Sequence, residues 1–180
     1  MRPAIFLDRD GVIIENRANY VRSWSDVSIY PQALRALSRV SKSEYALILV
    51  TNQSAVGRGI LPLSAVEEIN ARLIQAIEAA GGRIDGVYTC PHAPLDRCRC
   101  RKPEPGLLLQ AAQDRSLDLF HSIMIGDALS DIQAGQAAGV GKNILVLTGR
   151  GLAQSQLARP ENLQPFLIYD TLADALDALV

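Results

Sequence analysis

The chain has 180 residues, of which 48% are hydrophobic and 21% are charged, so it can bury a substantial core and is not intrinsically disordered. Its 18 basic and 19 acidic residues leave a formal net charge of −1, which argues against a protein that binds nucleic acid or membrane surfaces through bulk positive charge. No apolar run approaches the roughly 20 residues that span a bilayer, so we expect a cytoplasmic, monomeric protein with no membrane partner.

Short apolar runs alternate with segments of helical spacing along the chain. In chain order, the pattern predicts a strand over 4–7, a helix over 34–40, a strand over 46–50, a helix over 66–77, a strand over 84–88, a helix over 107–112, a strand over 123–125, a helix over 132–138, a strand over 144–147, a strand over 166–168 and a helix over 172–179. The strands are short, uninterrupted and often β-branched, which is typical of strands covered on both faces. We therefore expect an α/β fold, a Rossmann-like three-layer sandwich with a mainly parallel central sheet.

Polar residues follow the predicted strands at the points where ligands bind in folds of this class, beyond the carboxyl ends of the strands. Four segments carry these residues: Asp8-Arg9-Asp10-Gly11, Thr51-Asn52-Gln53-Ser54, Arg101-Lys102-Pro103 and Gly126-Asp127 with Asp131. Asp8 and Asp10 would repel each other at the end of a buried strand unless a cation or a proton joined them. With Asp127 they would form a hard oxygen site of the kind that Mg²⁺ prefers. The alternative is a turn in which the two aspartates only cap the backbone.

All three cysteines lie within eleven residues, and this clustering favours metal binding over a disulfide framework. The four candidate ligands are Cys90, His92, Cys98 and Cys100. A closed set of three thiolates and one imidazole is typical of structural zinc. The alternative is a set of ordinary buried cysteines, but the prolines and charged residues between them do not suit a core strand. Because Cys100 lies two residues before Lys102, zinc in the loop 90–100 is expected to position Arg101 and Lys102.

The four strand-end motifs resemble those of the haloacid dehalogenase-like phosphatase superfamily. The cysteine and histidine loop resembles that of its capless branch, which includes phosphatases of heptose bisphosphate and histidinol phosphate. The resemblance covers about residues 4–150 and implies a Mg²⁺-dependent phosphomonoesterase with a structural zinc. The expected reaction is removal of the 7-phosphate of D-glycero-D-manno-heptose 1,7-bisphosphate in lipopolysaccharide biosynthesis. Histidinol phosphate or another small sugar phosphate is an alternative substrate, and an inactive zinc-loop binding module is the alternative from another class.

The resemblance also implies roles for individual residues. Asp8 would be the nucleophile that forms an aspartyl phosphate, and Asp10 would act as the general acid and then the general base. Mg²⁺ would be held by Asp8, the backbone carbonyl of Asp10 and Asp127. Thr51 and Lys102 would hold the phosphoryl oxygens, where the charge of the transition state spreads.

The spacing between the motifs predicts an open site. There is room for one helix and a flap before the second motif, and for one helix, one strand and the zinc loop before the third. We therefore expect a single domain over 1–180 without a cap domain, with the zinc loop and the flap 16–24 as walls of the site.

The expected substrate contacts lie on these walls and in the second motif. They are Tyr20, Asn52, Gln53, Ser54 and Arg101. Arg101 would bind a second phosphate or a carboxylate in a two-pronged contact. Tyr20 and Trp24 are expected either to contact an apolar sugar face or simply to pack. Asp131 is expected to orient Lys102 or the waters of the metal without touching the substrate; the alternative is an aspartate that only stabilises the first turn of a helix.

Overall fold

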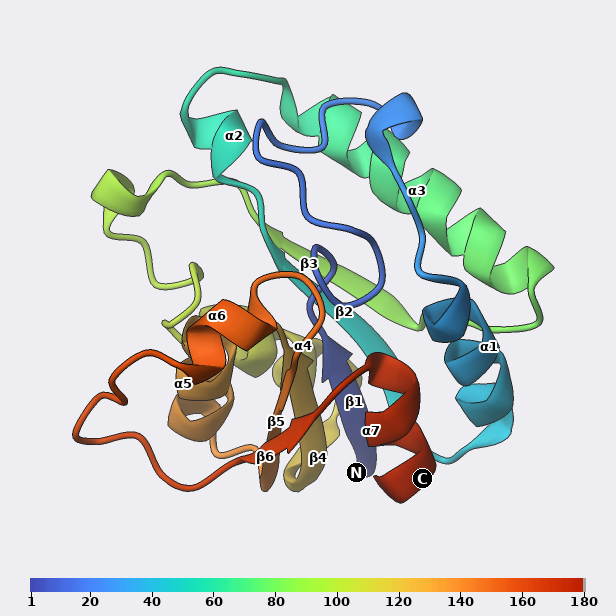
Figure 1. Cartoon of the computed structure of the whole chain (residues 1–180), viewed down its shortest axis with the longest axis vertical. Coiled ribbons are helices and arrows are strands. Elements are labelled where there is room, and N and C mark those ends of the chain that lie inside the picture. The colour runs from blue at the N-terminus through green and yellow to red at the C-terminus, as the bar shows by residue number, and fades with distance from the viewer. Residues whose placement is uncertain (180) are drawn as a thin grey trace.

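Six parallel strands form the central sheet of the computed structural model, which describes residues 1–179 (Figure 1). Their order across the sheet is β3-β2-β1-β4-β5-β6. The strands are β1 (Arg2–Leu7), β2 (Ala46–Asn52), β3 (Gly86–Cys90), β4 (Leu117–Gly126), β5 (Lys142–Val146) and β6 (Leu167–Tyr169). The predicted α/β sandwich with a parallel sheet is confirmed.

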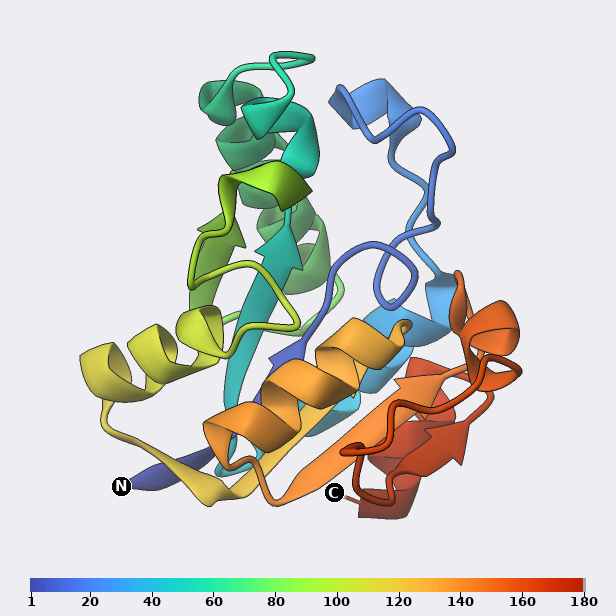
Figure 2. The same ribbon diagram turned by 90° about the vertical axis from the view of Figure 1, so that its left-hand side faces the viewer.

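Helices cover both faces of this sheet (Figure 2). They are α1 (Pro31–Arg39), α2 (Ser54–Gly57), α3 (Leu63–Ala79), α4 (Gly106–Arg115), α5 (Leu129–Ala138), α6 (Gly151–Ser155) and α7 (Leu172–Leu179). Helices α1, α3 and α7 pack on one face, and α4 and α5 pack on the other. Over residues 1–179, none of the helices has both the length and the apolar character needed to cross a membrane.

The alternation of side chains along each strand divides the core into two layers. Ile5 and Leu7 of β1 belong to the cluster under α1, α3 and α7, whereas Ala4 and Phe6 belong to the cluster under α4 and α5. Successive residues of a strand point to opposite faces, so an uninterrupted apolar run is what a strand covered on both faces requires. The continuous apolar runs of the sequence are explained by this arrangement.

Several boundaries differ from the predicted ones. Strand β3 lies two residues later than expected, because Asp85 uses its backbone N–H and its carboxylate to bind the backbone of Leu47 before the regular pairing begins. Strand β4 starts at Leu117, six residues earlier than expected, because its first residues pair with Arg2 and Pro3 across a register shift. The short helices α2 and α6 were not expected from the spacing of apolar residues.

From β1 the chain adds β2 and β3 on one side of the sheet and then β4, β5 and β6 on the other side. Ligands of such sheets bind where the direction changes, here in the gap between the ends of β1 and β4. Leu7 is in register with Ile125, and the backbone N–H of Asp8 donates a hydrogen bond to the Ile125 carbonyl at 3.0 Å. The segments that begin with Asp8 and with Asp127 therefore leave the sheet side by side.

Candidate active site

The Lys102 side chain lies between two buried carboxylates at this edge of the sheet. Its Nζ is 2.8 Å from Asp8 Oδ1 and 2.7 Å from Asp131 Oδ1. Its third hydrogen bond goes to the backbone carbonyl of Val50 at 2.9 Å. All three donors of the ammonium group are thus used. The predicted contact between Asp131 and Lys102 is present, and the other Asp131 oxygen accepts a hydrogen bond from the Ala128 backbone N–H at the start of α5.

The charges around Lys102 perturb one another. Burial raises the pKa of Asp8, Lys102 lowers it, and the carboxylates of Asp131 and Asp127 raise it; together these effects raise the pKa of Asp8 to about 7. Burial alone would lower the pKa of Lys102, but Asp131 and Asp8 more than offset that effect and raise it above its ordinary value. One lysine therefore faces more negative charge than it can balance, and this favours a further cation at the site.

Three carboxylates form a donor set suited to that cation. The candidate oxygens of Asp8, Asp127 and Asp131 all lie within 4.8 Å of one another, and all three residues are buried. Hard oxygen ligands at the end of a buried strand fit Mg²⁺, which usually binds one or two carboxylates and keeps several waters. Asp8 and Asp127 match the predicted magnesium ligands, so the donor chemistry fits the metal that the motifs imply.

The Asp10 carboxylate is not part of this donor set and is held by hydrogen bonds of its own. Arg9 donates to both Asp10 oxygens, at 3.0 and 3.3 Å, and to Asn70 Oδ1 at 2.9 Å. Gln53 Nε2 donates to Asp10 Oδ2 at 3.1 Å. Arg9 is only 1% exposed, so its two-pronged contact holds the Asp10 carboxylate in one orientation at the cavity wall. Neither Arg9 nor Asn70 was singled out from the sequence.

The end of β2 connects to the lysine loop. Asn52 accepts a hydrogen bond from the Lys102 backbone N–H at 3.1 Å and donates one to the Lys102 carbonyl at 3.0 Å. Gln53 Nε2 also donates to Thr51 Oγ1 at 2.8 Å. Thr51 is fully buried under this amide, so its hydroxyl does not line the cavity in this conformation. A phosphoryl contact from Thr51 would require the Gln53 side chain to move.

A cavity of about 550 Å³ opens above these groups. All five residues predicted to contact substrate line it: Tyr20, Asn52, Gln53, Ser54 and Arg101. Residues 16–18, 20 and 21 of the flap and Pro94 of the zinc loop contribute to its walls, as expected. Tyr20 also packs against a small apolar cluster that includes Leu61 and Val66. Trp24 packs against the core, with the Arg72 guanidinium 5.1 Å from its ring centre.

Asp127 has two partners that the sequence analysis did not identify. Asn16 Nδ2 donates to Asp127 Oδ2 at 2.6 Å, and Arg150 donates to both Asp127 oxygens. Arg150 belongs to the segment Thr148-Gly149-Arg150-Gly151 just after β5. The rule that polar residues follow the strands at the binding edge would have found it, had it been applied to the fifth strand.

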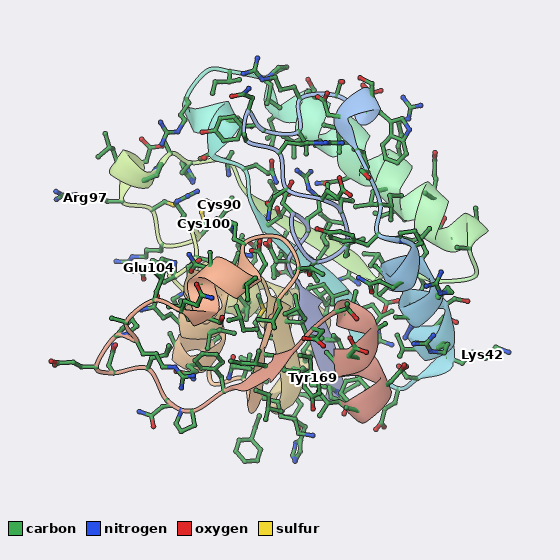
Figure 3. The ribbon with its side chains drawn as sticks, in the orientation of Figure 1. Lys42, Cys90, Arg97, Cys100, Glu104 and Tyr169 are labelled. Atoms are coloured by element: carbon green, nitrogen blue, oxygen red, sulfur yellow. The ribbon has the colours of Figure 1, made fainter. Side chains whose placement is uncertain are left out.

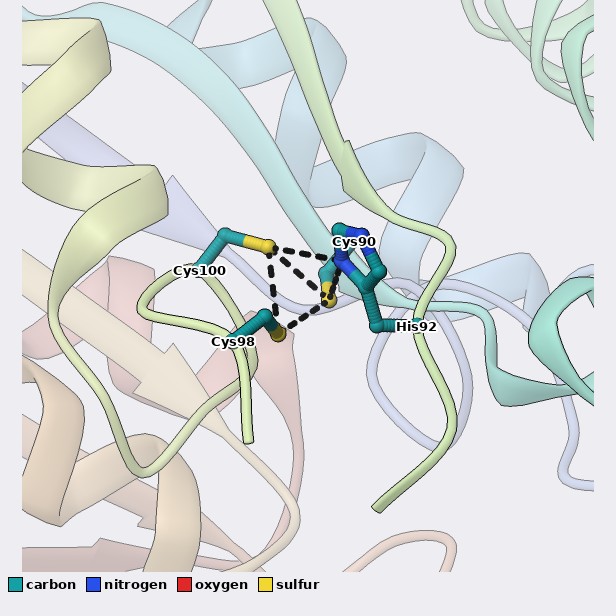
Figure 4. Close-up of side chains that lie close together, drawn as sticks. All are labelled: Cys90, His92, Cys98 and Cys100. Atoms are coloured by element: carbon teal, nitrogen blue, oxygen red, sulfur yellow. Dashed lines mark hydrogen bonds between the residues drawn. The ribbon is translucent and has the colours of Figure 1, made fainter. Parts of the chain in front are cut away.

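The cysteine and histidine side chains converge on one point (Figure 4). The five closest distances between their ligand atoms, sulfur or Nδ1, are 3.2–3.6 Å. Zinc–sulfur bonds of about 2.3 Å in a tetrahedron would separate the sulfurs by about 3.8 Å, so small adjustments would admit the ion. The four predicted ligands, Cys90, His92, Cys98 and Cys100, therefore come together as a closed set suited to structural zinc.

The loop that carries these ligands is tied to the site on two sides. The Cys90 carbonyl accepts a hydrogen bond from the Gln53 backbone N–H at 2.7 Å, and the Arg99 carbonyl accepts one from Gly106 at the start of α4 at 3.1 Å. Arg101 Nη1 donates to the His92 carbonyl at 3.4 Å. Arg97 points outward, away from Cys90 (Figure 3). The loop is thus coupled to the second and third motifs through its backbone.

Comparisons with known proteins agree with this site. A HAD-hydrolase-like family model matches residues 99–175. The D-glycero-beta-D-manno-heptose-1,7-bisphosphate 7-phosphatase of Pseudomonas aeruginosa is 34% identical over 179 residues, covering 99% of this chain and 98% of the relative. The protein of the same name from Photorhabdus laumondii is 37% identical over 184 residues, covering 98% of this chain and 95% of the relative.

Solved structures extend the similarity to the fold. The D,D-heptose 1,7-bisphosphate phosphatase of Bordetella bronchiseptica, complexed with magnesium and phosphate, has a TM-score of 0.90 and 33% identity, covering 98% of this chain and 97% of that one. The corresponding enzyme of Burkholderia thailandensis has a TM-score of 0.74 and 28% identity, again covering 98% and 97%.

The relatives that match nearly the whole chain identify its family. The chain belongs to the haloacid dehalogenase-like phosphatases. Its relatives over nearly the whole length carry the name D-glycero-beta-D-manno-heptose-1,7-bisphosphate 7-phosphatase.

Proposed function

We propose that this protein is a Mg²⁺-dependent phosphomonoesterase that removes the 7-phosphate of D-glycero-D-manno-heptose 1,7-bisphosphate. One observation carries the chemical part of the proposal. A fully paired lysine, Lys102, holds the Asp8 carboxylate at the floor of a cavity that Asp10 also lines. Because this charged set is complete, an active phosphatase is favoured over an inactive zinc-loop binding module.

In the proposed reaction, an Asp8 oxygen attacks phosphorus, and the bond between phosphorus and the sugar oxygen breaks. Asp10 gives its proton to the departing sugar oxygen, which leaves as an alcohol. A water molecule then attacks the phosphorus of the aspartyl phosphate and gives a proton to Asp10, and the bond between phosphorus and the Asp8 oxygen breaks. The products are the dephosphorylated sugar, inorganic phosphate and regenerated Asp8 and Asp10. Mg²⁺, held by Asp8, Asp127 and the Asp10 backbone carbonyl, would supply charge neutralisation between the carboxylate and the phosphate.

Other residues of the site orient the reacting groups or supply charge to the phosphoryl oxygens. Asp131 and the Val50 carbonyl hold the Lys102 ammonium beside Asp8, where it can also neutralise a phosphoryl oxygen. Arg9 holds the Asp10 carboxylate. Thr51 is proposed to bind a second phosphoryl oxygen once Gln53 turns toward the substrate.

The walls of the cavity support a bisphosphate rather than histidinol phosphate. Arg17 and Arg101 both line it, and a second phosphate would gain from either guanidinium. The ammonium group of histidinol phosphate would instead meet like charge there. The names of the full-length relatives point to the same substrate.

We propose that residues 1–180 act as one domain in which the loop 90–100 holds a structural zinc that does not touch the substrate and acts on catalysis only by positioning Arg101 and Lys102. The closed ligand set supports this, because such a set leaves no position for water or substrate. A monomeric state and a cytoplasmic location remain predictions from the sequence, and light scattering of the purified chain would test the first.

The test of function uses purified protein with zinc retained and Mg²⁺ added. Phosphate release is measured on heptose 1,7-bisphosphate, histidinol phosphate, another sugar bisphosphate and a 3′-phosphorylated oligonucleotide. For the best sugar bisphosphate, ³¹P NMR identifies the phosphate that is lost. We expect loss of the 7-phosphate with retention of the 1-phosphate.

Asp8→Asn is the decisive variant, because it preserves the shape of the side chain and removes the nucleophile. The matched control is Asp118→Asn, an aspartate that pairs with His121 on the surface, outside the residues that line the cavity. Asp8→Asn should lose nearly all turnover, and Asp118→Asn should retain it. Wild-type turnover in Asp8→Asn would refute the assignment of Asp8 as the nucleophile. Preference of the wild-type enzyme for another phosphate ester would refute only the proposed substrate.

A further inference from the structure

The Asp127 carboxylate is fully buried, and within residues 1–179 every hydrogen bond that it accepts comes from two residues. Its Oδ2 accepts hydrogen bonds from Asn16 Nδ2 at 2.6 Å, from the Arg150 backbone N–H at 2.9 Å and from Arg150 Nε at 3.3 Å. Its Oδ1 accepts one hydrogen bond, from Arg150 Nη2 at 2.9 Å. Asn16 and Arg150 line the cavity, whereas Asp127 itself does not. These two residues therefore lie between the carboxylate and the open space.

One of the contacts to Oδ2, the Arg150 backbone N–H, belongs to a conformationally restricted segment. Thr148 Oγ1 donates to the Gly11 carbonyl at 2.6 Å, which ties the segment after β5 to the first motif. Gly149 has φ of +59°, and a Cβ added there would collide with the Gly11 backbone and with Asp127. Only glycine fits this close approach with a positive φ. The backbone N–H of Arg150 is therefore fixed on Oδ2.

The contact to Oδ1, in contrast, comes from a side chain and not from the backbone. It is made by the end of a long side chain that is 57% exposed, and no backbone N–H of the described part of the chain donates to Oδ1. A guanidinium on an exposed side chain can leave at modest cost, because water can solvate it. A buried carboxylate cannot lose its counter-charge without replacement. Release of the guanidinium thus requires another cation at Oδ1.

We propose that the Arg150 side chain is an exchangeable counter-ion of the magnesium site, competing with Mg²⁺ for Oδ1 of Asp127. The backbone N–H of Arg150 and the Asn16 amide keep the carboxylate oriented through Oδ2 in both states. When Mg²⁺ takes Oδ1, the guanidinium moves into the cavity that it already lines. Arg150 is therefore a positioning residue that sets the affinity of the site for its metal and protects the protein when magnesium is scarce.

The experiment measures Mg²⁺ binding in the absence of substrate, so its result does not depend on which phosphate ester the enzyme prefers. Calorimetric titration compares wild type with Arg150→Met and Arg150→Lys, with zinc content verified for each protein. Arg150→Met removes the competing cation and keeps the backbone N–H, so Mg²⁺ should bind about tenfold more tightly. Arg150→Lys keeps one competing charge, so its affinity for Mg²⁺ should lie between those of wild type and Arg150→Met. The matched control is Arg17→Met, which removes the same charge from the cavity wall without touching Asp127 and should change the affinity by about twofold or less.

Two further readouts separate competition from a structural role. Without Mg²⁺, Arg150→Met should melt at a lower temperature than wild type, and saturating Mg²⁺ should remove most of that difference. In ¹⁵N spectra, the Arg150 Nε–H resonance, assigned by its loss in Arg150→Lys, should shift as Mg²⁺ is added and exchange faster with water. Unchanged or weaker Mg²⁺ binding in Arg150→Met would overturn the proposal, as would equal tightening in Arg17→Met or an unmoved Nε–H resonance.

Discussion

Replacing Lys102 with methionine should expose how strongly the active site depends on one buried cation. Methionine fills a similar volume, so the main loss is the charge that faces Asp8 at 2.8 Å and Asp131 at 2.7 Å. Both partners are buried, and breaking a buried ion pair by removing one partner costs about 3–5 kcal/mol. We therefore expect Lys102→Met to lower the free energy of unfolding by about 3–5 kcal/mol when magnesium is omitted.

Urea denaturation followed by far-UV circular dichroism measures this loss, and a double-mutant cycle assigns it. Asp131→Asn removes one carboxylate charge but keeps an oxygen that can accept the hydrogen bond from the Ala128 backbone N–H. If the pair is coupled as its geometry indicates, the double variant should be less destabilised than the sum of the single variants by about 1–3 kcal/mol. Activity should fall about 100-fold or more in Lys102→Met, because a preorganised positive charge beside the phosphoryl group is lost.

A Lys102→Met protein destabilised by less than about 1 kcal/mol, or additive effects in the cycle, would contradict this dependence on Lys102. Either result would mean that solvent or another cation balances the two carboxylates. A stable variant with full phosphatase activity would also remove Lys102 from the proposed chemistry.

Three other predictions concern the zinc loop, the flap and the segment after β5. Cys98→Ser should lose bound zinc, measured by elemental analysis, and kcat/KM should fall about 10–100-fold because the loop no longer positions the third motif. The backbone N–H groups of Arg22 and Ser23 hold the pKa of Asp26 below its ordinary value. The stability that Asp26 gives the flap should therefore be complete above that ordinary value and lost as the pH falls through the lower pKa of the folded state. NMR titration of the two amides would show this loss. Gly149→Ala should destabilise the protein by about 1–3 kcal/mol in chemical denaturation and weaken Mg²⁺ binding, because its φ is +59° and a Cβ would strike Asp127.

Each of these predictions has its own control. A zinc-free protein that kept full kcat and KM would contradict the role of the loop. An Asp26 midpoint at or above its ordinary value near 3.8 would contradict the capping by the two amides. For Gly149→Ala the matched variant is Gly59→Ala, whose φ is +68° with nothing within 4 Å of the added Cβ. Equal effects of the two glycine variants would mean that backbone strain alone, and not contact with Asp127, is responsible.

Much of the fold could be predicted because its signals are local. Each apolar run that is covered on both faces is continuous in the sequence, and each ends in polar residues that a parallel sheet brings to one edge. This is why Asp8 and Asp127 could be assigned to one site from residues far apart in the chain. The less regular pieces were missed, because α2 and α6 are too short to show helical periodicity and the first half of β4 depends on pairing across a register shift.

In the candidate site, too, local signals could be identified from the sequence, whereas contacts between distant side chains could not. The four zinc ligands could be identified from the sequence because their chemistry is unusual and their spacing is short. The sequence does not show that Gln53 covers the Thr51 hydroxyl or that Arg9 turns inward to hold Asp10. Both depend on rotamers that packing selects.

The chemical groups at the ends of the strands could be predicted without coordinates, because strand length and residue type follow from local patterns in the amino-acid sequence. The pairing of the charges, in contrast, depends on how the folded chain arranges these groups in space. Lys102 balances Asp8 and Asp131, and Arg150 balances Asp127, because these contacts are set by the angle and stagger at which loops leave neighbouring strands. Distances of a few ångströms between buried charges govern metal affinity and stability, and those distances exist only once the sheet has formed.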